Sequence, residues 1–288
     1  MRRSLVVVAV LAVLAGCSGK KPLVPADQLW TEGNDAMKDE AWEIAVEKYK
    51  ALLDQYPFDA NAEEAELKIA QAYYFSERYP EAIASFADFE RMHPTSPNLA
   101  EIEYRRGMAY IAQQSTPDRD QQSLTQALTS FQNIVDRYPG TPWAERAALR
   151  VRECRETLAA HDAGIADFYL DRGALLAAES RLRGLVSDYP ETDATARTLH
   201  QFAGVYAGRQ EPEESTLALA TLVYHHPEGP LADDARERLK GKEVVPPGQD
   251  PLPLLVSKLD SLRTQEDRLL VPRPVSAYSD RPAMGGGY

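Results

Sequence analysis

The sequence is poor in cysteine and lacks a long apolar run. Only two cysteines occur in 288 residues, Cys17 and Cys154. Two cysteines allow one disulfide at most, which excludes a small fold held together by several disulfides. The apolar stretch at residues 5–14 is too short for a membrane-spanning helix, which needs about 20 apolar residues. With 44% of its residues hydrophobic, the chain is expected to build a sizeable core of its own.

The sequence also lacks the motifs of common catalytic sites. It contains no HExxH zinc-protease motif, no GxSxG elbow and no glycine-rich loop for a phosphate. Five histidines occur, and they form no convincing ligand pair with a nearby acid or cysteine. They are His93, His161, His200, His225 and His226. We expect no catalysis, no metal and no cofactor.

An excess of positive charge is missing as well. The chain has 32 Lys and Arg residues against 44 Asp and Glu residues, giving a formal net charge of −12. Such a surface argues against binding to nucleic acid and against electrostatic adhesion to anionic lipid. Attachment to a membrane would therefore need another means.

The N-terminus offers that means. Arg2 and Arg3 precede the short apolar stretch, and residues 14–17 read Leu-Ala-Gly-Cys. This is the pattern of a signal peptide at residues 1–16, and its ending resembles a bacterial lipobox with Cys17 as the lipidated first residue of the mature protein. Ser18 then favours delivery to the outer membrane, and residues 17–25 form a lipidated tether. An ordinary secreted protein with an incidental cysteine is the alternative.

The strongest positive signal is a helical unit closed by proline. An apolar pair followed within a few residues by proline ends at Pro57, Pro94, Pro139, Pro190 and Pro227. Aligned on these prolines, the chain fits the tetratricopeptide pattern, in which small residues let two helices cross closely and a large residue fills the space beside them. The small residues are Gly33, Ala70, Ala166 and Ala203 in first helices and Ala45, Ala82, Ala127 and Ala178 in second helices. We predict an all-α tetratricopeptide-repeat solenoid of five helix pairs.

The repeats fall into two groups. Residues 26–139 form repeats one to three, and residues 140–240 form repeats four and five. The polar stretch at residues 113–122 predicts an inserted loop in repeat three. The stretch at residues 142–171 has no proline after Pro142, which predicts one long helix or two nearly collinear helices.

The C-terminal residues 241–288 have a different composition. Their seven prolines and closing glycines indicate a mostly disordered tail. Within it, leucines and valine recur at helical spacing between Pro251 and Pro272. This short amphipathic helix either caps the last repeat or docks on a partner.

The concave side of this repeat type is lined by fixed positions of the first helices. In repeats one to three, these positions carry large apolar and aromatic groups, including Trp30, Met37, Leu67, Tyr74, Tyr104 and Met108. Exposed aromatic groups beside amides favour an extended peptide ligand with aromatic side chains. The alternative is that some of these residues pack internally. The same positions in repeats four and five are smaller and more polar.

Ordered sequence runs then point to a family. They include LAGCSG at 14–19, YPF at 56–58, HPTSPN at 93–98, YRRGMAY at 104–110, DRD at 118–120, RYPGTPW at 137–143 and ADFYLDRGA at 166–174. Together they resemble the BamD family, the tetratricopeptide lipoproteins of the bacterial β-barrel assembly machinery. The resemblance spans residues 14 to about 227. It departs at Gln121, where the family run has proline, and in the longer tail.

The resemblance implies a non-enzymatic subunit on the periplasmic face of the outer membrane. Its partners would be the POTRA region of the barrel-forming subunit, the C-terminal targeting signals of unfolded outer-membrane proteins, and accessory lipoproteins in some bacteria. Those targeting signals are extended and end in an aromatic residue. The family's substrate-linked tyrosine matches Tyr56, and its partner-contacting arginines match Arg172 and Arg181. Arg181 also has a plain alternative as a solvated helix residue.

A second function remains open from the sequence. A tetratricopeptide lipoprotein could instead be an adaptor for cell-wall enzymes or for the Tol-Pal system. The chain has no N-terminal coiled-coil heptad run, which weighs against the Tol-associated type.

Overall fold

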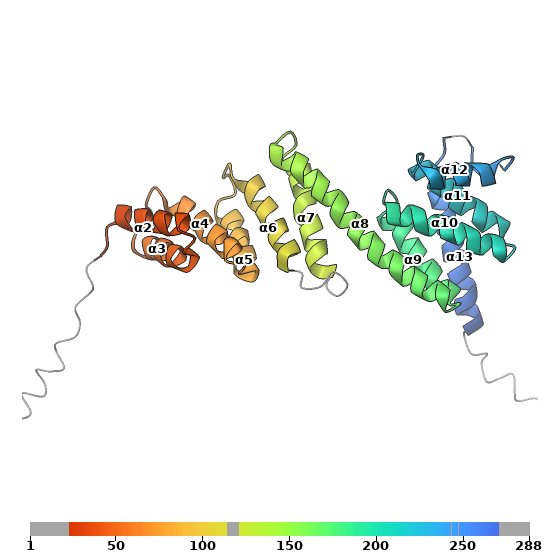
Figure 1. The fold of residues 1–288 in the computed structure, drawn as a ribbon, viewed down its shortest axis with the longest axis horizontal. Helices are drawn as coiled ribbons and strands as arrows, with labels where there is room; N and C mark the ends of the chain where they lie inside the picture. The colour runs from red at the N-terminus through yellow and green to blue at the C-terminus, as the bar shows by residue number, and fades with distance from the viewer. Residues whose placement is uncertain (1–22, 114–120, 243, 247, 271–288) are drawn as a thin grey trace, which may run out of the picture. The chain divides into compact units, whose positions relative to one another are not determined.

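The computed structural model describes residues 23–113, 121–242, 244–246 and 248–270, and every regular element in these residues is an α-helix (Figure 1). This confirms the all-α prediction. The chain divides into two compact units, residues 1–115 with 136–139, and residues 116–135 with 140–288. None of the helices in the described ranges is long and apolar enough to cross a membrane. Cys17 and the signal peptide lie outside the described residues.

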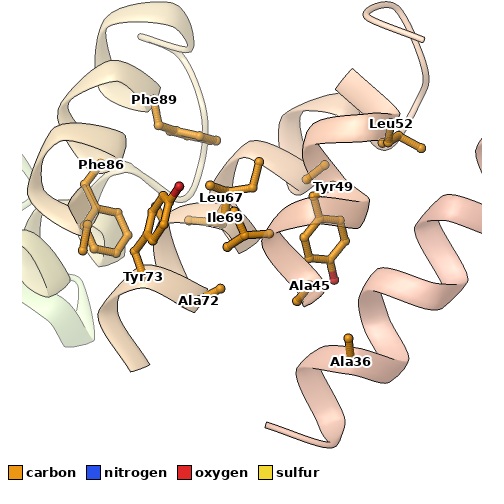
Figure 2. Close-up of a cluster of buried hydrophobic side chains, with 14 of the residues drawn as sticks. Ala36, Ala45, Tyr49, Leu52, Leu67, Ile69, Ala72, Tyr73, Phe86 and Phe89 are labelled. Atoms are coloured by element: carbon orange, nitrogen blue, oxygen red, sulfur yellow. The ribbon is translucent and has the colours of Figure 1, made fainter. Parts of the chain in front are cut away.

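The first unit is built from helix hairpins. Each helix packs against the next one in the chain, and short turns reverse the direction between them. In Figure 2, Leu67 and Ile69 lie between Tyr49 on one side and Phe86 and Phe89 on the other. The helices are α2 (Ala26–Lys38), α3 (Trp42–Gln55), α4 (Ala62–Phe75), α5 (Tyr79–Met92) and α6 (Leu99–Gln113).

The small residues of the repeat pattern lie where paired helices cross. A Cβ atom on Gly33 of α2 would stand 2.6 Å from Cε1 of Tyr49 on α3, closer than real Cβ atoms come to a neighbour. Ala45 and Tyr49, four residues apart on α3, are both fully buried. Burial is complete at the equivalent pairs as well, Ala82 with Phe86, Ala127 with Phe131 and Ala178 with Leu182. The predicted repeat signature is therefore the packing signature of the fold.

One turn geometry joins the paired helices in four repeats. The second residue after the first helix adopts the left-handed conformation, and the next backbone N–H bonds the carbonyl five residues earlier, as in a helix-ending Schellman motif. The left-handed residues are Glu40 (φ 56°), Glu77 (φ 61°), Gly173 (φ 70°) and Gln210 (φ 64°). Only one of the four is glycine, so three turns form at a conformational cost.

The second unit contains the remaining helices. Its α8 is a single continuous helix, which decides between the two alternatives for residues 142–171. Thr141 caps it by accepting a hydrogen bond from the Ala144 N–H, and Pro142 stands at its first position. The helices are α7 (Gln121–Arg137), α8 (Pro142–Asp171), α9 (Leu175–Asp188), α10 (Asp193–Gly208), α11 (Pro212–His225), α12 (Pro230–Leu239) and α13 (Leu252–Leu270).

The C-terminal residues 241–288 contain the one helix that the sequence predicted there. The helix predicted between Pro251 and Pro272 is α13, and it packs against α9 and α11. Leu255 and Leu259 are 0% and 4% exposed, and both belong to the core of the second unit. The short amphipathic helix predicted within residues 241–288 is therefore confirmed, and it packs on the last repeats as the capping alternative expected. Residues 271–288 lie outside the described part of the chain.

The inserted loop of repeat three is only partly visible. Gln113 ends α6 and Gln121 begins α7, so both ends of the predicted stretch at 113–122 are helical. Residues 114–120 between them lie outside the described residues.

Candidate functional site

The residues predicted to line a groove lie on the first helices of repeats one to three. Trp30 and Met37 are on α2, Leu67 and Tyr74 on α4, and Tyr104 and Met108 on α6. Five of the six side chains are half-buried. Leu67 is only 8% exposed and belongs to the core of the first unit, so it supports this face from beneath.

Trp30 lies against the core on one side. Its ring centroid is 5.6 Å from that of Tyr49, and Lys68 Nζ lies 5.9 Å from the Trp30 ring centre, within reach of a cation–π interaction. The Tyr49 hydroxyl donates to Oδ1 of Asn34 at 2.9 Å. Burial raises the pKa of Tyr49, which keeps this hydroxyl protonated as a donor.

Tyr74 belongs to an aromatic cluster that sequence reasoning missed, formed by Trp42, Tyr74, Phe75 and Tyr79. Phe75 stacks on Trp42 with centroids 5.3 Å apart, while Tyr74 meets Phe75 and Tyr79 edge-on at 5.6 and 5.9 Å. Phe75 is still 46% exposed. The carbon centre of the Arg105 guanidinium lies 6.0 Å from the Phe75 ring, which adds a cation to the cluster. The cluster is thus accessible at Phe75, and the flanking Arg105 is paired with Glu101 at 2.7 Å.

The signal for this cluster was present in the sequence. Tyr74 and Phe75 are adjacent at the end of α4, and Trp42 and Tyr79 begin the second helices of their repeats. Sequence reasoning considered only the concave positions of first helices, which exclude Trp42, Phe75 and Tyr79. The cluster lies at the turns that join each first helix to its second helix.

Tyr56 has a structural partner in the first unit. Its hydroxyl donates to the carbonyl oxygen of Val24 at 3.1 Å, and its ring packs against the core. Val24 lies just before α2 and is packed against the same core. Tyr56 therefore fixes the point at which the N-terminal segment reaches the first repeat.

Tyr104 and Met108 stand one turn apart on α6, next to a buried ion-pair network. Arg106 on α6 contacts Glu90 on α5 at 2.5 Å and Glu103 at 3.3 Å. Desolvation raises the pKa of Glu90, and the nearby Arg106 opposes that shift. The second arginine of the YRRGM run thus joins α5 to α6, which holds the α6 face in place.

The predicted partner-binding arginines lie in the second unit. The guanidinium of Arg172 lies 3.5 Å from the ring centre of Phe168, and its Nη1 donates to the Phe168 carbonyl at 3.2 Å. Phe168 is 48% exposed, so the pair forms an exposed aromatic and cationic surface at the end of α8. Arg181 on α9 is exposed and lies 3.4 Å from Oδ1 of Asp162. Sequence reasoning did not find Phe168.

Polar side chains that could suggest chemistry have structural partners. His93 Nε2 lies 2.6 Å from Oε2 of Glu66, which joins repeat two across its helices. Cys154 is 2% exposed, and burial raises the pKa of its thiol to about 11, so it is held as an unreactive thiol. Within the described ranges, no group of three or more His, Cys, Asp or Glu residues could hold a metal ion.

Similarity to known proteins places the chain in a family. The family model YfiO, described as an outer membrane lipoprotein family, matches residues 22–218, well over half of the chain. The chain belongs to the YfiO family. The match covers all five helix pairs up to the middle of α11, and α12 and α13 follow it.

Three relatives of this YfiO-family chain carry the same name. The outer membrane protein assembly factor BamD of Vibrio cholerae is 34% identical over 202 residues, covering 66% of this chain and 84% of the relative. The BamD of Caulobacter vibrioides is 29% identical over 252 residues, covering 85% of this chain and 82% of the relative. The BamD of Neisseria gonorrhoeae is 26% identical over 219 residues, covering 73% of this chain and 82% of the relative.

Proposed function

We propose that this chain is a non-catalytic lipoprotein subunit of the complex that assembles β-barrel proteins in the outer membrane. The observation that carries the proposal is the family match over residues 22–218, together with relatives that are named assembly factors. The lipobox ending at Cys17 supports a lipid anchor, with the repeats on the periplasmic face. The helical repeat fold supports a binding role, since such arrays present extended surfaces to partners.

The first unit is proposed to receive the C-terminal targeting signals of unfolded outer-membrane proteins. Such signals end in an aromatic residue in the family that the chain resembles. The aromatic cluster of Trp42, Tyr74, Phe75 and Tyr79 suits this ligand, because a further ring gains about 0.5–1.5 kcal/mol from edge or offset contacts beyond its burial. Tyr104, Met108 and Trp30 extend the apolar face along the first helices.

The second unit is proposed to dock the barrel-forming subunit through its POTRA region. The exposed pair of Phe168 and Arg172 combines two residue types that are enriched in interface hot spots. Arg181 adds a second exposed guanidinium, held only at 3.4 Å by Asp162. Both arginines are free enough to exchange their present contacts for a partner's carboxylates.

Depletion of the protein followed by partner identification tests the proposal. Depletion should lower the amount of barrel proteins in the outer membrane, and a mild-detergent pull-down should recover the barrel-forming subunit. Unchanged barrel levels would refute the assembly role. Recovery of cell-wall hydrolases or Tol-Pal components, without a barrel-forming partner, would establish the adaptor function instead.

A further inference from the structure

Phe58 is the most exposed large hydrophobic side chain in the described residues, at 99%. It occupies the third position of a tight turn at residues 56–59, which is closed by a hydrogen bond from the Asp59 N–H to the Tyr56 carbonyl at 3.0 Å. Pro57 at the second position fixes the backbone there. The ring is therefore held out by a rigid turn.

Equivalent turns in other repeats do not carry an apolar residue at this position. The turn after His93 is closed by the Ser96 N–H at 3.1 Å, and the turn after Tyr189 is closed by the Thr192 N–H at 3.2 Å. The residues that follow the repeat-closing prolines are Thr95, Gly140, Glu191 and Glu228. Phe58 is thus a feature of the first repeat alone, so the turn itself does not require it.

Further apolar side chains share this edge of the first unit. Because α2 and α4 begin here and α3 and α5 end here, the positions of Leu23, Phe58 and Met92 all lie at one edge of the first unit. Leu23 is 69% exposed and Met92 is 49% exposed. Phe75 lies at the opposite edge, at the other end of α4. We refer to Leu23, Phe58 and Met92 as the apolar edge.

The N-terminal tether reaches the unit at the same edge. The hydrogen bond from Tyr56 to Val24, 3.1 Å long, joins the tether to the turn that carries Phe58. Cys17 precedes Val24 by seven residues, which reach roughly 25 Å when fully extended. A lipid surface that holds an acylated Cys17 therefore lies within that distance of the turn.

We infer that the apolar edge, with Phe58 at its centre, contacts the lipid surface in which Cys17 is anchored. This inference rests on the proposed lipid anchor. The nearby Asp59 carboxylate accepts hydrogen bonds from the N–H and the side chain of Asn61 at 2.9 and 3.0 Å. Two attachments, the acyl chains and an inserted ring, would hold the first repeat at the membrane more firmly than the acyl chains alone.

The test uses the lipidated protein in vesicles of phosphatidylethanolamine and phosphatidylglycerol. Phe58→Cys and, as the control at the opposite edge, Phe75→Cys each receive a polarity-sensitive fluorophore, and Cys154 does not compete because it is 2% exposed. We expect the label at position 58 to shift to the blue and to be quenched by spin-labelled lipid several-fold more strongly than the label at position 75. Equal quenching at both positions would overturn the inference.

Two further outcomes separate the inference from the proposed function. Vesicle flotation of the wild-type protein tests the lipid anchor itself. Failure to float would refute both the proposed anchor and the proposed lipid contact of the apolar edge. A label at position 58 that responds only after a C-terminal barrel peptide is added would make the edge a protein site and overturn the lipid assignment.

A partitioning experiment tests the Phe58 contact without the acyl chains. It uses the mature chain made non-acylated by Cys17→Ser. In that chain, Phe58→Thr, which copies Thr95 of repeat two, should weaken vesicle partitioning about tenfold. Unchanged partitioning would also contradict the inference.

Discussion

At the scale of single residues, two substitutions at the left-handed turn positions should change the unfolding free energy in opposite directions. Gln210 is exposed and has φ 64°, a conformation that costs a non-glycine residue about 1–2 kcal/mol. Gln210→Gly should therefore raise the unfolding free energy of the second unit by about 0.5–1 kcal/mol, after the larger entropy of the unfolded glycine is counted. Gly173→Ala, at φ 70° with no atom near its Cβ position, should lower it by a similar amount. Urea unfolding followed by circular dichroism measures both changes.

Gly33 gives a second residue-scale prediction. Its Cβ position lies 2.6 Å from the fully buried Tyr49 ring, so Gly33→Ala forces the ring to move and should destabilise the first unit by about 1–3 kcal/mol. Gly164→Ala is the matched control, because nothing lies within 4 Å of its Cβ position in the middle of α8. An alanine that is tolerated equally well at both positions would contradict the close crossing of α2 and α3.

The small residues at helix crossings and the aromatic cluster differ in how far they could be predicted from the sequence. The small position at Gly33 was predicted because close helix crossing leaves a periodic mark in the sequence. The aromatic cluster could not be predicted in the same way, since Trp42 and Phe75 meet between helices of neighbouring repeats rather than along one helix face. Which ring stays accessible depends on packing between repeats, which no local pattern records.

At the scale of elements, α13 should be held by its apolar face rather than by its ion pairs. Leu255 is 0% exposed against α9 and α11, so Leu255→Ala should cost about 2–4 kcal/mol. Leu254→Ala, at the neighbouring position with 46% exposure, should be nearly neutral. Lys258→Ala, which removes contacts to Glu213 and Glu214 at 2.8 and 3.2 Å, should cost less than about 1 kcal/mol. Hydrogen exchange of α11 and α13 would rank the three variants. If Leu254→Ala lost as much protection as Leu255→Ala, the packing of α13 on α9 and α11 through Leu255 would be refuted.

The sequence predicted the existence of this helix and left its role open. An amphipathic period looks the same whether the apolar face covers the helix's own repeats or a partner. The deciding feature is the surface it covers, and that surface is assembled from α9 and α11, which are distant in sequence. The long helix at 142–171 was left open for a similar reason, because the absence of proline permits continuity without requiring it.

At the scale of the whole molecule, two units with different exposed chemistry predict two separable binding activities. Tyr74→Ala and Tyr104→Ala in the first unit should each weaken binding of a C-terminal barrel peptide about tenfold, roughly 1.4 kcal/mol, while the barrel-forming subunit still co-purifies. In the second unit, Arg181→Glu and Arg172→Glu each replace an exposed guanidinium with a carboxylate. These variants should bind the peptide normally but lose co-purification of the barrel-forming subunit. Fluorescence anisotropy and pull-down measure the two activities on the same four proteins. Loss of both activities in any single variant with intact helicity would show that the units do not act independently.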